Sequence, residues 1–355
     1  MSIFQKMAAH DHEEIVFCND ASSGLKAIIA IHNTTLGPAL GGSRMWPYET
    51  AEEALEDVLR LSRGMTYKAA VAGLDLGGGK TVIIGDQKKD KSEALFRALG
   101  RFIEGLNGRY ITAEDVGTST GDMADIARET NHVRGCSQGA GGSGDPSPVT
   151  AFGALRGLQA AVKWTLDKDD LEGLTVAIQG AGQVGYYLAK QLAAKGCKLV
   201  VADIDDRRTA RVKEECGARV VGTEAIFDEP CDVFSPCALG AILNSETIPR
   251  LKCKIVAGAA NNQIAREEDG DAMVKRGILY APDYIVNAGG LISVWHEGPN
   301  YNRDMVMDQV DKLYDTTLKV FELAENYDLK PEDAAQRLAE QRIAQVGKLR
   351  RIHRS

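Results

Sequence analysis

The sequence predicts an α/β protein of two domains, the second of which is a doubly wound, parallel sheet. Three observations support this prediction. The chain has 355 residues, which is more than twice the ~150 residues of a typical domain. After residue 170, short apolar runs of strand length alternate with helical patterns, and this alternation indicates a parallel sheet with helices on both faces. A cluster of glycine and proline at 139–148 is typical of a linker or hinge between the two parts.

Composition and charge exclude several classes of protein. With 44% hydrophobic and 26% charged residues the chain resembles an ordinary globular protein, and its formal charge of -8 gives no electrostatic reason to bind nucleic acid. It contains no apolar run long enough to span a membrane and no signal-peptide core. The seven cysteines are scattered without a CxxC pair, which argues against a disulfide framework and a metal site. We therefore expect a cytoplasmic protein without metal, nucleic acid or membrane as partner.

The first domain is expected to mix strands with helices. Alternating apolar residues predict a strand at 25–32, and a second apolar run predicts another at 81–85. Helical periodicity predicts helices over 50–61 and 92–106.

The second domain has a regular rhythm of strands and helices. Apolar runs predict strands at 175–179, 198–203, 219–221, 232–234 and 254–257. Helices are predicted at 184–194 and 206–215. A helical pattern then covers 305–346, with a break near Leu329-Lys330-Pro331.

A glycine motif follows the first strand of the second domain. Its residues are Gly180, Ala181, Gly182, Gln183, Val184 and Gly185, a G-x-G-x-x-G pattern between a predicted strand and a predicted helix. In that context Gly180 allows a tight turn, Gly182 lets a pyrophosphate approach the backbone, and Gly185 allows close helix–strand packing. The helix N-terminus would supply N–H groups to the phosphates. The motif therefore predicts a dinucleotide site, against the alternative of a purely structural turn.

Acidic residues after the next strand bear on the choice of cofactor. Asp203 stands where an acid hydrogen-bonds the adenosine ribose, and with Asp205 and Asp206 it would repel a 2'-phosphate. This favours NAD over NADP. Arg207 and Arg208 weaken this preference for NAD, because NADP enzymes bind the 2'-phosphate with a nearby arginine.

Three charged residues of the first domain lie among small residues. Lys80 follows three glycines, but a phosphate loop would need glycine where Leu74 stands. Of the two lysines, Lys68 and Lys80, one could anchor an amino-acid carboxylate, and the other, buried beside a cation, could act as a base near neutral pH. Asp115 could accept the proton of an amine. The alternative is that all three are solvated or salt-bridged surface groups.

Long segments of the chain resemble the glutamate/leucine/phenylalanine/valine dehydrogenase family, and most closely its leucine dehydrogenases. They are residues 34–46, 61–70, 76–86, 105–118, 142–153, 236–249, 257–263 and 281–292. The resemblance implies a substrate and oligomerisation domain over 1–140, joined by C-terminal helices over 330–355. It also implies a Rossmann-type NAD domain over 141–329, an amino acid and ammonium as reactants, and a homo-oligomer.

The same resemblance implies roles for individual residues. Lys68 would hold the substrate carboxylate, Lys80 would be the base that activates water, and Asp115 would handle the amine proton. Segments beside the substrate would contain Gly41, Gly42 and Pro146, and those near the cofactor Thr150, Asn261 and Asn262.

The resemblance also implies an apolar pocket for the substrate side chain. Its residues would be Leu40, Met65, Ala113, Leu291 and Val294. Such a pocket favours leucine, isoleucine and valine, because glutamate would lack a cation for its second carboxylate. Two departures from the leucine enzymes are Arg134 and the pair Trp295-His296. Arg134 points either into the pocket or outward, where it would pair with Glu129 or another nearby acid.

Three alternatives stay open. The first is a phenylalanine or other apolar amino-acid dehydrogenase of the same family, and the second is an NADP-linked enzyme of the glutamate type. The third is a nicotinamide-binding sensor without catalysis. The presence of Lys68, Lys80 and Asp115 together argues against a sensor, because binding alone needs none of that chemistry.

Overall fold

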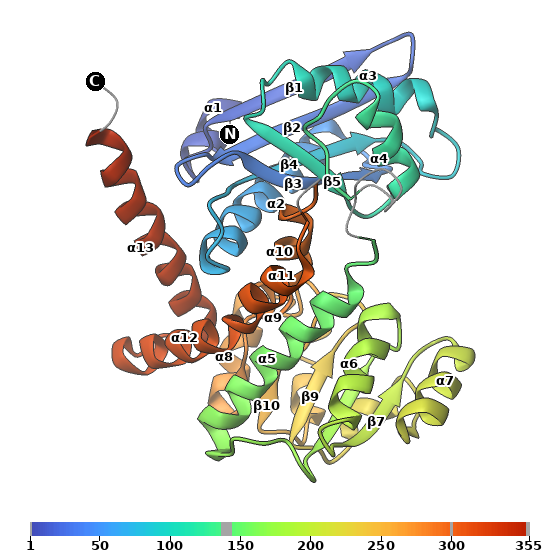
Figure 1. Cartoon of the computed structure of the whole chain (residues 1–355), viewed down its shortest axis with the longest axis vertical. Coiled ribbons are helices and arrows are strands. Elements are labelled where there is room, and N and C mark those ends of the chain that lie inside the picture. The colour runs from blue at the N-terminus through green and yellow to red at the C-terminus, as the bar shows by residue number, and fades with distance from the viewer. Residues whose placement is uncertain (1, 136–143, 299–300, 353–355) are drawn as a thin grey trace. The chain divides into compact units, whose positions relative to one another are not determined.

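The chain forms two compact units in a computed structural model that describes residues 2–135, 144–298 and 301–352 (Figure 1). The first unit contains the chain up to Gly144, residues 294–301 and the chain from Ala339 onward; the second contains Asp145–Ser293 and Asn302–Leu338. The domain boundary predicted from the sequence is 140/141, and the chain is predicted to return to the first domain at 330. The first unit instead takes in residues 294–301 and then the chain from Ala339, so that one helix, α13 (Pro331–Ile352), contributes residues to both units.

The first unit is built on a mixed five-stranded sheet. In spatial order its strands are β1 (Glu14–Asp20), β2 (Leu25–Asn33), β4 (Gly77–Ile84), β3 (Ala39–Trp46) and β5 (Tyr110–Glu114). β2 pairs antiparallel with β1 and β4, whereas β3 pairs parallel with β4 and β5. The predicted strand at 25–32 is therefore present as β2.

Helices cover both faces of this sheet. One face packs its buried side chains against α2 (Ala51–Val71) and the other against α3 (Glu93–Glu104) and α4 (Thr120–Ala127). A short helix, α1 (Ile3–Ala8), precedes β1. α2 begins after Thr50, whose hydroxyl caps it by accepting the Glu53 N–H, but it continues to Val71 rather than ending at 61. Packing of its last turns against the sheet outweighs the ~1 kcal/mol cost of Gly64 in a helix.

The three glycines before Lys80 belong to strand β4, which the sequence analysis begins only at 81. Glycine is rare inside strands, so the apolar pattern misses this part. The structure gives the reason for the glycines. A Cβ on Gly78 would lie 2.1 Å from the backbone N of Thr66, and one on Gly79 would lie 2.6 Å from the Tyr110 ring. β4 thus lies closer to α2 and to Tyr110 than any side chain would allow.

The second unit is built on a six-stranded sheet whose paired strands all run parallel. In spatial order the strands are β11 (Leu279–Tyr280), β10 (Ile255–Val256), β9 (Val233–Pro236), β6 (Thr175–Gln179), β7 (Lys198–Ala202) and β8 (Arg219–Val220). Helices α6 (Gln183–Ala193) and α7 (Asp206–Cys216) alternate with them, and 3₁₀ turns lie at Ala225–Asp228 and Ile248–Arg250. The predicted α/β class with a doubly wound parallel sheet is confirmed.

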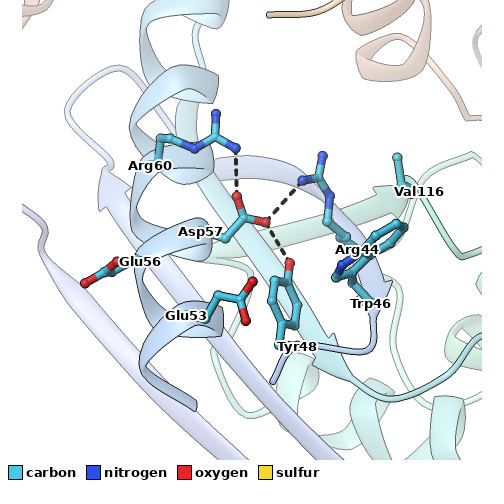
Figure 2. Close-up of a pocket in the computed structure, with 8 residues that line it drawn as sticks. All are labelled: Arg44, Trp46, Tyr48, Glu53, Glu56, Asp57, Arg60 and Val116. Atoms are coloured by element: carbon cyan, nitrogen blue, oxygen red, sulfur yellow. Dashed lines mark hydrogen bonds and ion pairs between the residues drawn. The ribbon is translucent and has the colours of Figure 1, made fainter. Parts of the chain in front are cut away.

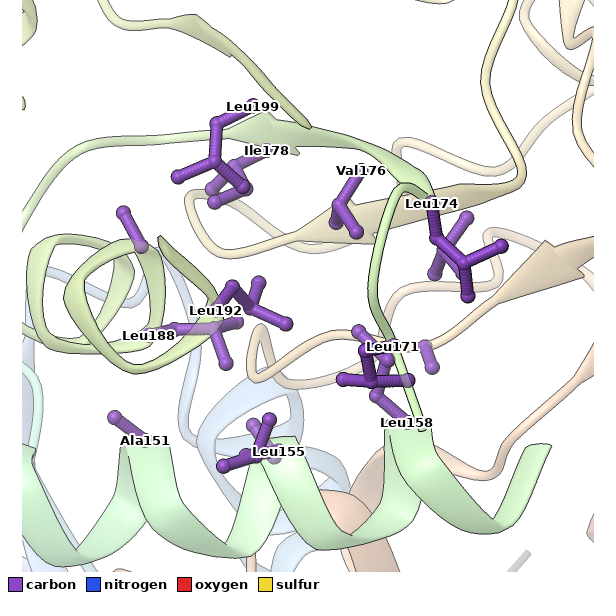
Figure 3. Close-up of a cluster of buried hydrophobic side chains, with 14 of the residues drawn as sticks. Ala151, Leu155, Leu158, Leu171, Leu174, Val176, Ile178, Leu188, Leu192 and Leu199 are labelled. Carbon is purple, nitrogen blue, oxygen red and sulfur yellow. The ribbon is translucent and has the colours of Figure 1, made fainter. Parts of the chain in front are cut away.

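The helix α5 (Ser147–Leu166) begins inside the expected linker at 139–148. Residues 139–143 lie outside the described part of the chain, as does Cys136. Pro146 is the N-cap of α5 and Pro148 lies in its first turn, where proline is tolerated because that N–H has no helical partner. Leucines of α5 and α6 then pack on the β6 side chains Val176 and Ile178 (Figure 3). This apolar core fixes the strand from which the glycine motif emerges.

The remaining helices are α8 (Glu267–Lys275), α9 (Asp283–Val286), α10 (Gly289–Trp295), α11 (Arg303–Asp311), α12 (Leu313–Tyr327) and α13. The predicted break falls between α12 and Pro331.

Within the first unit, Arg342 of α13 donates to the Leu74 carbonyl and, at 2.8 Å, to the Asp75 carboxylate. Among the described helices, none is both long and apolar enough to cross a bilayer.

Candidate active site

A buried ion pair lies on the α2 face of the first sheet. The Lys80 Nζ atom of β4 is 2.6 Å from the Oδ2 atom of Asp115, which follows β5. Lys80 pairs with Ala30, and its neighbour on the same face, Val82, packs against α2. Only 6% of Lys80 is exposed. A lysine so poorly hydrated is rare in proteins without a paired charge, and Asp115 supplies that charge.

The two members of this pair shift each other's protonation. Burial lowers the pKa of Lys80 below its ordinary value, although Asp115 opposes the change. Burial alone would raise the pKa of Asp115, but Lys80 and Arg44 outweigh it, so that this pKa lies below the ordinary range. Asp115 is therefore ionised at neutral pH, and Lys80 gives up its proton more readily than a free lysine.

Small residues hold Asp115 in place. A Cβ on Gly42 would lie 2.8 Å from the Asp115 Cβ, so only glycine lets β3 and Asp115 approach this closely. The Thr118 hydroxyl accepts the Asp115 backbone N–H at 3.0 Å and contacts the Ser43 carbonyl at 2.8 Å. Gly117 has φ of 81°, a conformation that glycine adopts without strain.

A network of charged side chains stands behind Asp115, and Figure 2 shows its outer part. Arg44 of β3 donates through Nε to Asp115 Oδ2 at 3.2 Å and through Nη1 to Asp57 Oδ2 at 3.1 Å. Asp57 also accepts from the Tyr48 hydroxyl at 2.6 Å and from Arg60 Nη2 at 2.7 Å. Arg44, Tyr48, Asp57 and Arg60, but not Asp115, line a cavity of about 530 Å³. The sequence analysis missed Arg44 and Asp57; only the glycines before Arg44 could have drawn attention to it.

The other expected substrate residues of the first unit lie on or beside the same sheet face. Lys68 and Met65 are half-buried on α2, which covers this face. A Cβ on Gly41 would be 3.3 Å from the Met65 Cγ and 1.7 Å from the Gly79 carbonyl oxygen. Two buried apolar residues complete the set, Leu40 of β3 and Ala113 of β5.

Three expected substrate residues lie elsewhere in the chain. Pro146 begins α5 and Leu291 is buried in α10, both within the second unit. Val294 also belongs to α10 but is grouped with the first unit, as is Trp295.

Arg134 does not pair with Glu129. The Glu129 carboxylate is already bound by Arg97 Nε at 2.6 Å and by Arg101 Nε at 3.1 Å. Arg134 instead donates through Nη1 to the Val133 carbonyl at 2.8 Å. The expected pair with Glu129 is therefore wrong, because Arg97 and Arg101 of α3 already bind that carboxylate.

The second unit has a cavity of about 610 Å³ at the carboxyl ends of β6, β7 and β9. The glycine motif forms one wall. Gly180 has φ of 104°, and a Cβ on Gly185 would lie 2.0 Å from the Gly180 carbonyl oxygen. At Gly182, the N-cap of α6, a Cβ would meet nothing nearer than Arg208 Nη1 at 4.0 Å. Backbone open to the cavity beside a helix N-terminus is suited to a pyrophosphate.

Asp203 lines this cavity, where its carboxylate holds the glycine turn. Oδ2 accepts the Ala181 N–H at 2.6 Å and Oδ1 accepts the Asp205 N–H at 2.9 Å. Arg208 also lines the cavity, with Nη1 3.9 Å from Asp203 Oδ1. Arg207 pairs with Asp205 and its side chain is 92% exposed.

The remaining expected cofactor residues lie in the same unit. Gln183 and Val184 open α6. Asn261 and Asn262 follow β10, where the Asn287 amide donates to Asn261 Oδ1 at 2.8 Å. Thr150 of α5 donates to the Pro146 carbonyl at 3.0 Å. Within the described residues, no group of three or more His, Cys, Asp and Glu side chains could hold a metal ion.

Comparisons with known proteins identify the family. Residues 12–132 match the Glu/Leu/Phe/Val dehydrogenase dimerisation domain, and residues 141–209 and 202–351 match the Glutamate/Leucine/Phenylalanine/Valine dehydrogenase family. This chain belongs to the glutamate/leucine/phenylalanine/valine dehydrogenase family. It is accordingly an amino-acid dehydrogenase that uses a nicotinamide cofactor.

Relatives within the family differ in their named substrates. A leucine dehydrogenase of Thermoactinomyces intermedius is 57% identical over 99% of this chain and 96% of its own length. A phenylalanine dehydrogenase of Bacillus thermotolerans is 48% identical over 98% and 92%. The crystal structure of an L-tryptophan dehydrogenase from Nostoc punctiforme superposes with a TM-score of 0.88, at 44% identity, over 97% of this chain and 99% of that one.

Proposed function

We propose that this enzyme catalyses the NAD-dependent, reversible oxidative deamination of leucine, isoleucine and valine to their 2-oxo acids and ammonium. The observation that carries the proposal is the buried Lys80–Asp115 pair, 2.6 Å apart, on a sheet face that also bears the apolar residues Leu40 and Ala113. The leucine dehydrogenase that is 57% identical supports the choice of substrate over phenylalanine.

Each charged residue of the first unit has a task in this reaction. Lys68 binds the substrate carboxylate with its ammonium group. Asp115, which its lowered pKa keeps ionised at neutral pH, contacts the substrate ammonium and accepts its proton. Lys80, whose pKa burial lowers, takes the proton of a water molecule. That water attacks the imine carbon, and the adduct collapses to the 2-oxo acid and ammonium.

The second unit is suited to hold the dinucleotide. Gly180, Gly182 and the N-terminus of α6 would hold the pyrophosphate, and Asp203 would exchange its bond to the Ala181 N–H for the ribose hydroxyls. A nicotinamide held there would supply the acceptor for the hydride of the substrate Cα. Asp203 and Asp205 disfavour a 2'-phosphate, and Arg208 is partly neutralised by both, at 3.9 and 3.7 Å.

We further propose that the enzyme is a cytoplasmic homo-oligomer. The match of residues 12–132 to a dimerisation domain supports self-association. The cysteines that the structure describes, such as Cys18 and Cys253, are free thiols, which fits a reducing compartment.

An absorbance assay at ~340 nm, where the reduced nicotinamide absorbs, tests the proposed function. With NAD and a panel of L-amino acids, we expect kcat/KM to be highest for leucine, isoleucine or valine, lower for phenylalanine and tryptophan, and close to zero for glutamate. If glutamate came first, a cation would have to lie in the pocket, and Arg134 would be the first residue to replace. No reduction of NAD with any amino acid would remove the proposed function altogether.

Replacement of Asp203 by Ala should weaken NAD binding and narrow its advantage over NADP. A hydrogen bond to a charged group contributes ~1.5–3 kcal/mol, so the KM for NAD should rise roughly 10- to 150-fold. The Asp203 carboxylate also holds the Ala181 N–H, so thermal unfolding of the variant is the necessary control. A wild-type enzyme that uses both cofactors equally would show that Arg208 decides the specificity instead.

Trimming Ala113 to Gly should shift the substrate preference toward aromatic amino acids. Ala113 is 7% exposed, and its methyl group takes space that a ring would need. The kcat/KM ratio of phenylalanine to leucine should rise by ~10- to 200-fold at most, since one methylene in a pocket discriminates by no more. An unchanged ratio would mean that Ala113 does not bound the pocket.

A further inference from the structure

The contacts around Asp115 point to a positioning role for a residue outside the expected substrate set. Asp115 Oδ2 receives two cationic donors, Lys80 Nζ at 2.6 Å and Arg44 Nε at 3.2 Å. Lys80 is assigned a role in the chemistry, and it must change its own protonation during turnover. Arg44 is charged at every accessible pH, so its charge, unlike that of Lys80, stays the same throughout turnover.

Arg44 is itself held at its far end. Its Nη1 atom donates to Asp57 Oδ2 at 3.1 Å, and the same oxygen accepts from the Tyr48 hydroxyl at 2.6 Å. Asp57 Oδ1 accepts from Arg60 at 2.7 Å. Figure 2 shows the Asp57 carboxylate at the centre of these three donors. A carboxylate with three donors has little freedom to rotate, and the guanidinium that it binds is planar and rigid.

We propose that Arg44 is a positioning residue for Asp115, clamped at one end by Asp57 and holding the reacting carboxylate at the other. This inference rests on the proposed function, because it assigns to Arg44 the task of keeping Asp115 directed at the substrate amine. Both carboxylates are poorly exposed, at 17% for Asp57 and 21% for Asp115, as is Arg44 at 21%. The clamp therefore works where water screens charges weakly.

The clamp also sets the electrostatic balance of the site. Lys80 from β4 and Arg44 from β3 face Asp115, Glu114 adjoins it on β5, and Asp57 of α2 lies behind Arg44. Two tyrosines complete the surroundings: Tyr110 interacts electrostatically with Asp115, and Tyr48 binds Asp57. Arg44 disfavours the protonated form of Lys80, whereas Asp57 favours it. Loss of the Arg44 charge should therefore raise the pKa of Lys80, and loss of the Asp57 charge should lower it.

The test is the pH profile of leucine deamination by the full-length enzyme. Lys80 must be neutral to act as a base, so kcat/KM falls on the acidic side of its pKa. Arg44→Met should lower kcat by at least ~10-fold and move this acidic limb to higher pH. Asp57→Asn, which keeps the shape of the side chain, should lower kcat less and move the limb to lower pH. The KM for NAD should change in neither variant.

Two further variants separate positioning from charge and from general stability. Arg44→Lys keeps the charge, but one ammonium cannot reproduce the fork that binds both carboxylates, so kcat should fall while the limb stays near that of the wild type. Arg109→Met is the matched control. Arg109 precedes β5 and pairs with Glu14 at 2.6 Å, and its side chain is 55% exposed, so its loss should leave kcat and the pH profile unchanged.

The outcomes distinguish this inference from the proposed function. An active wild type with Arg44→Met within twofold of it in kcat, and with an unshifted limb, would overturn the positioning role alone. If Arg44→Met does not fold, Asp57→Asn decides: an unmoved limb and unchanged kcat would also overturn it. A wild type that deaminates no amino acid would overturn both. The positioning role predicts both results together: limbs that move in opposite directions in Arg44→Met and Asp57→Asn, and a fall of kcat in Arg44→Lys, which keeps the charge.

Discussion

Replacing Lys80 by Ala should reduce kcat at least ~10²-fold, the usual scale for loss of a general base, while the affinity for the reduced nicotinamide changes little. The site of Lys80 is closed, with 6% of the residue exposed, so bulk water cannot readily replace its amine. Single-turnover and steady-state absorbance measurements with leucine would separate the chemical step from product release. Lys80 also balances the charge of Asp115, so its removal leaves that carboxylate with Arg44 alone.

A pH series on the wild type complements this variant. Burial lowers the pKa of Lys80, so the neutral, basic form becomes available below the ordinary lysine range, and kcat/KM should rise with pH until it passes that pKa. In Lys80→Ala the residual activity should lose this rise. Near-normal turnover of Lys80→Ala, or an acidic limb that survives in it, would assign the base to another residue.

Replacing Lys68 by Ala should raise the KM for leucine strongly, with a smaller effect on kcat. A carboxylate anchor acts in the ground state and in the transition state alike, so its loss appears mainly in KM. A hydrogen bond to a charged group contributes ~1.5–3 kcal/mol, which corresponds to a rise of roughly 10- to 150-fold. Lys68 is half-buried near the end of α2, and Lys68→Met would control for the packing of its aliphatic stem.

A substrate without the carboxylate gives an independent measure of the same contact. If Lys68 binds that group, an amine analogue of leucine should bind the wild type and Lys68→Ala equally weakly as a competitive inhibitor. A KM for leucine that does not change in Lys68→Ala would contradict the anchor role.

Five of the six strands in the parallel sheet of the second unit could be predicted from the sequence, and only the two-residue edge strand β11 was not. The predicted strand at 175–179 coincides with β6, and the helix predicted at 206–215 differs from α7 by one residue. Buried parallel strands appear as short apolar runs, and the helix between Asp205 and Gly217 has a side-chain cap at its start and a left-handed glycine at its end. Such local signals need no knowledge of the tertiary structure.

The elements that were missed lack such signals. The start of β4 consists of glycines that close packing requires, and α5 begins at Ser147 between two prolines. The site was predictable where unusual neighbours marked a residue, as the glycines mark Lys80. Asp57 is one of several acids along α2, and its contact with Arg44 joins residues that are distant in sequence. Nothing local distinguishes it from a solvated glutamate.

The glycines of strands β3 and β4 in the first sheet also limit how this enzyme can be redesigned. At Gly41, Gly42 and Gly78 an added Cβ would collide with backbone or with a held side chain, at 1.7, 2.6 and 2.1 Å from the nearest atom. In a mutant library at these positions we expect almost all variants to be inactive or misfolded, because packed neighbours prevent the main chain from shifting to make room. Useful diversity for new amines should come from positions that already carry a side chain, with Met65 and Ala113 the first to randomise.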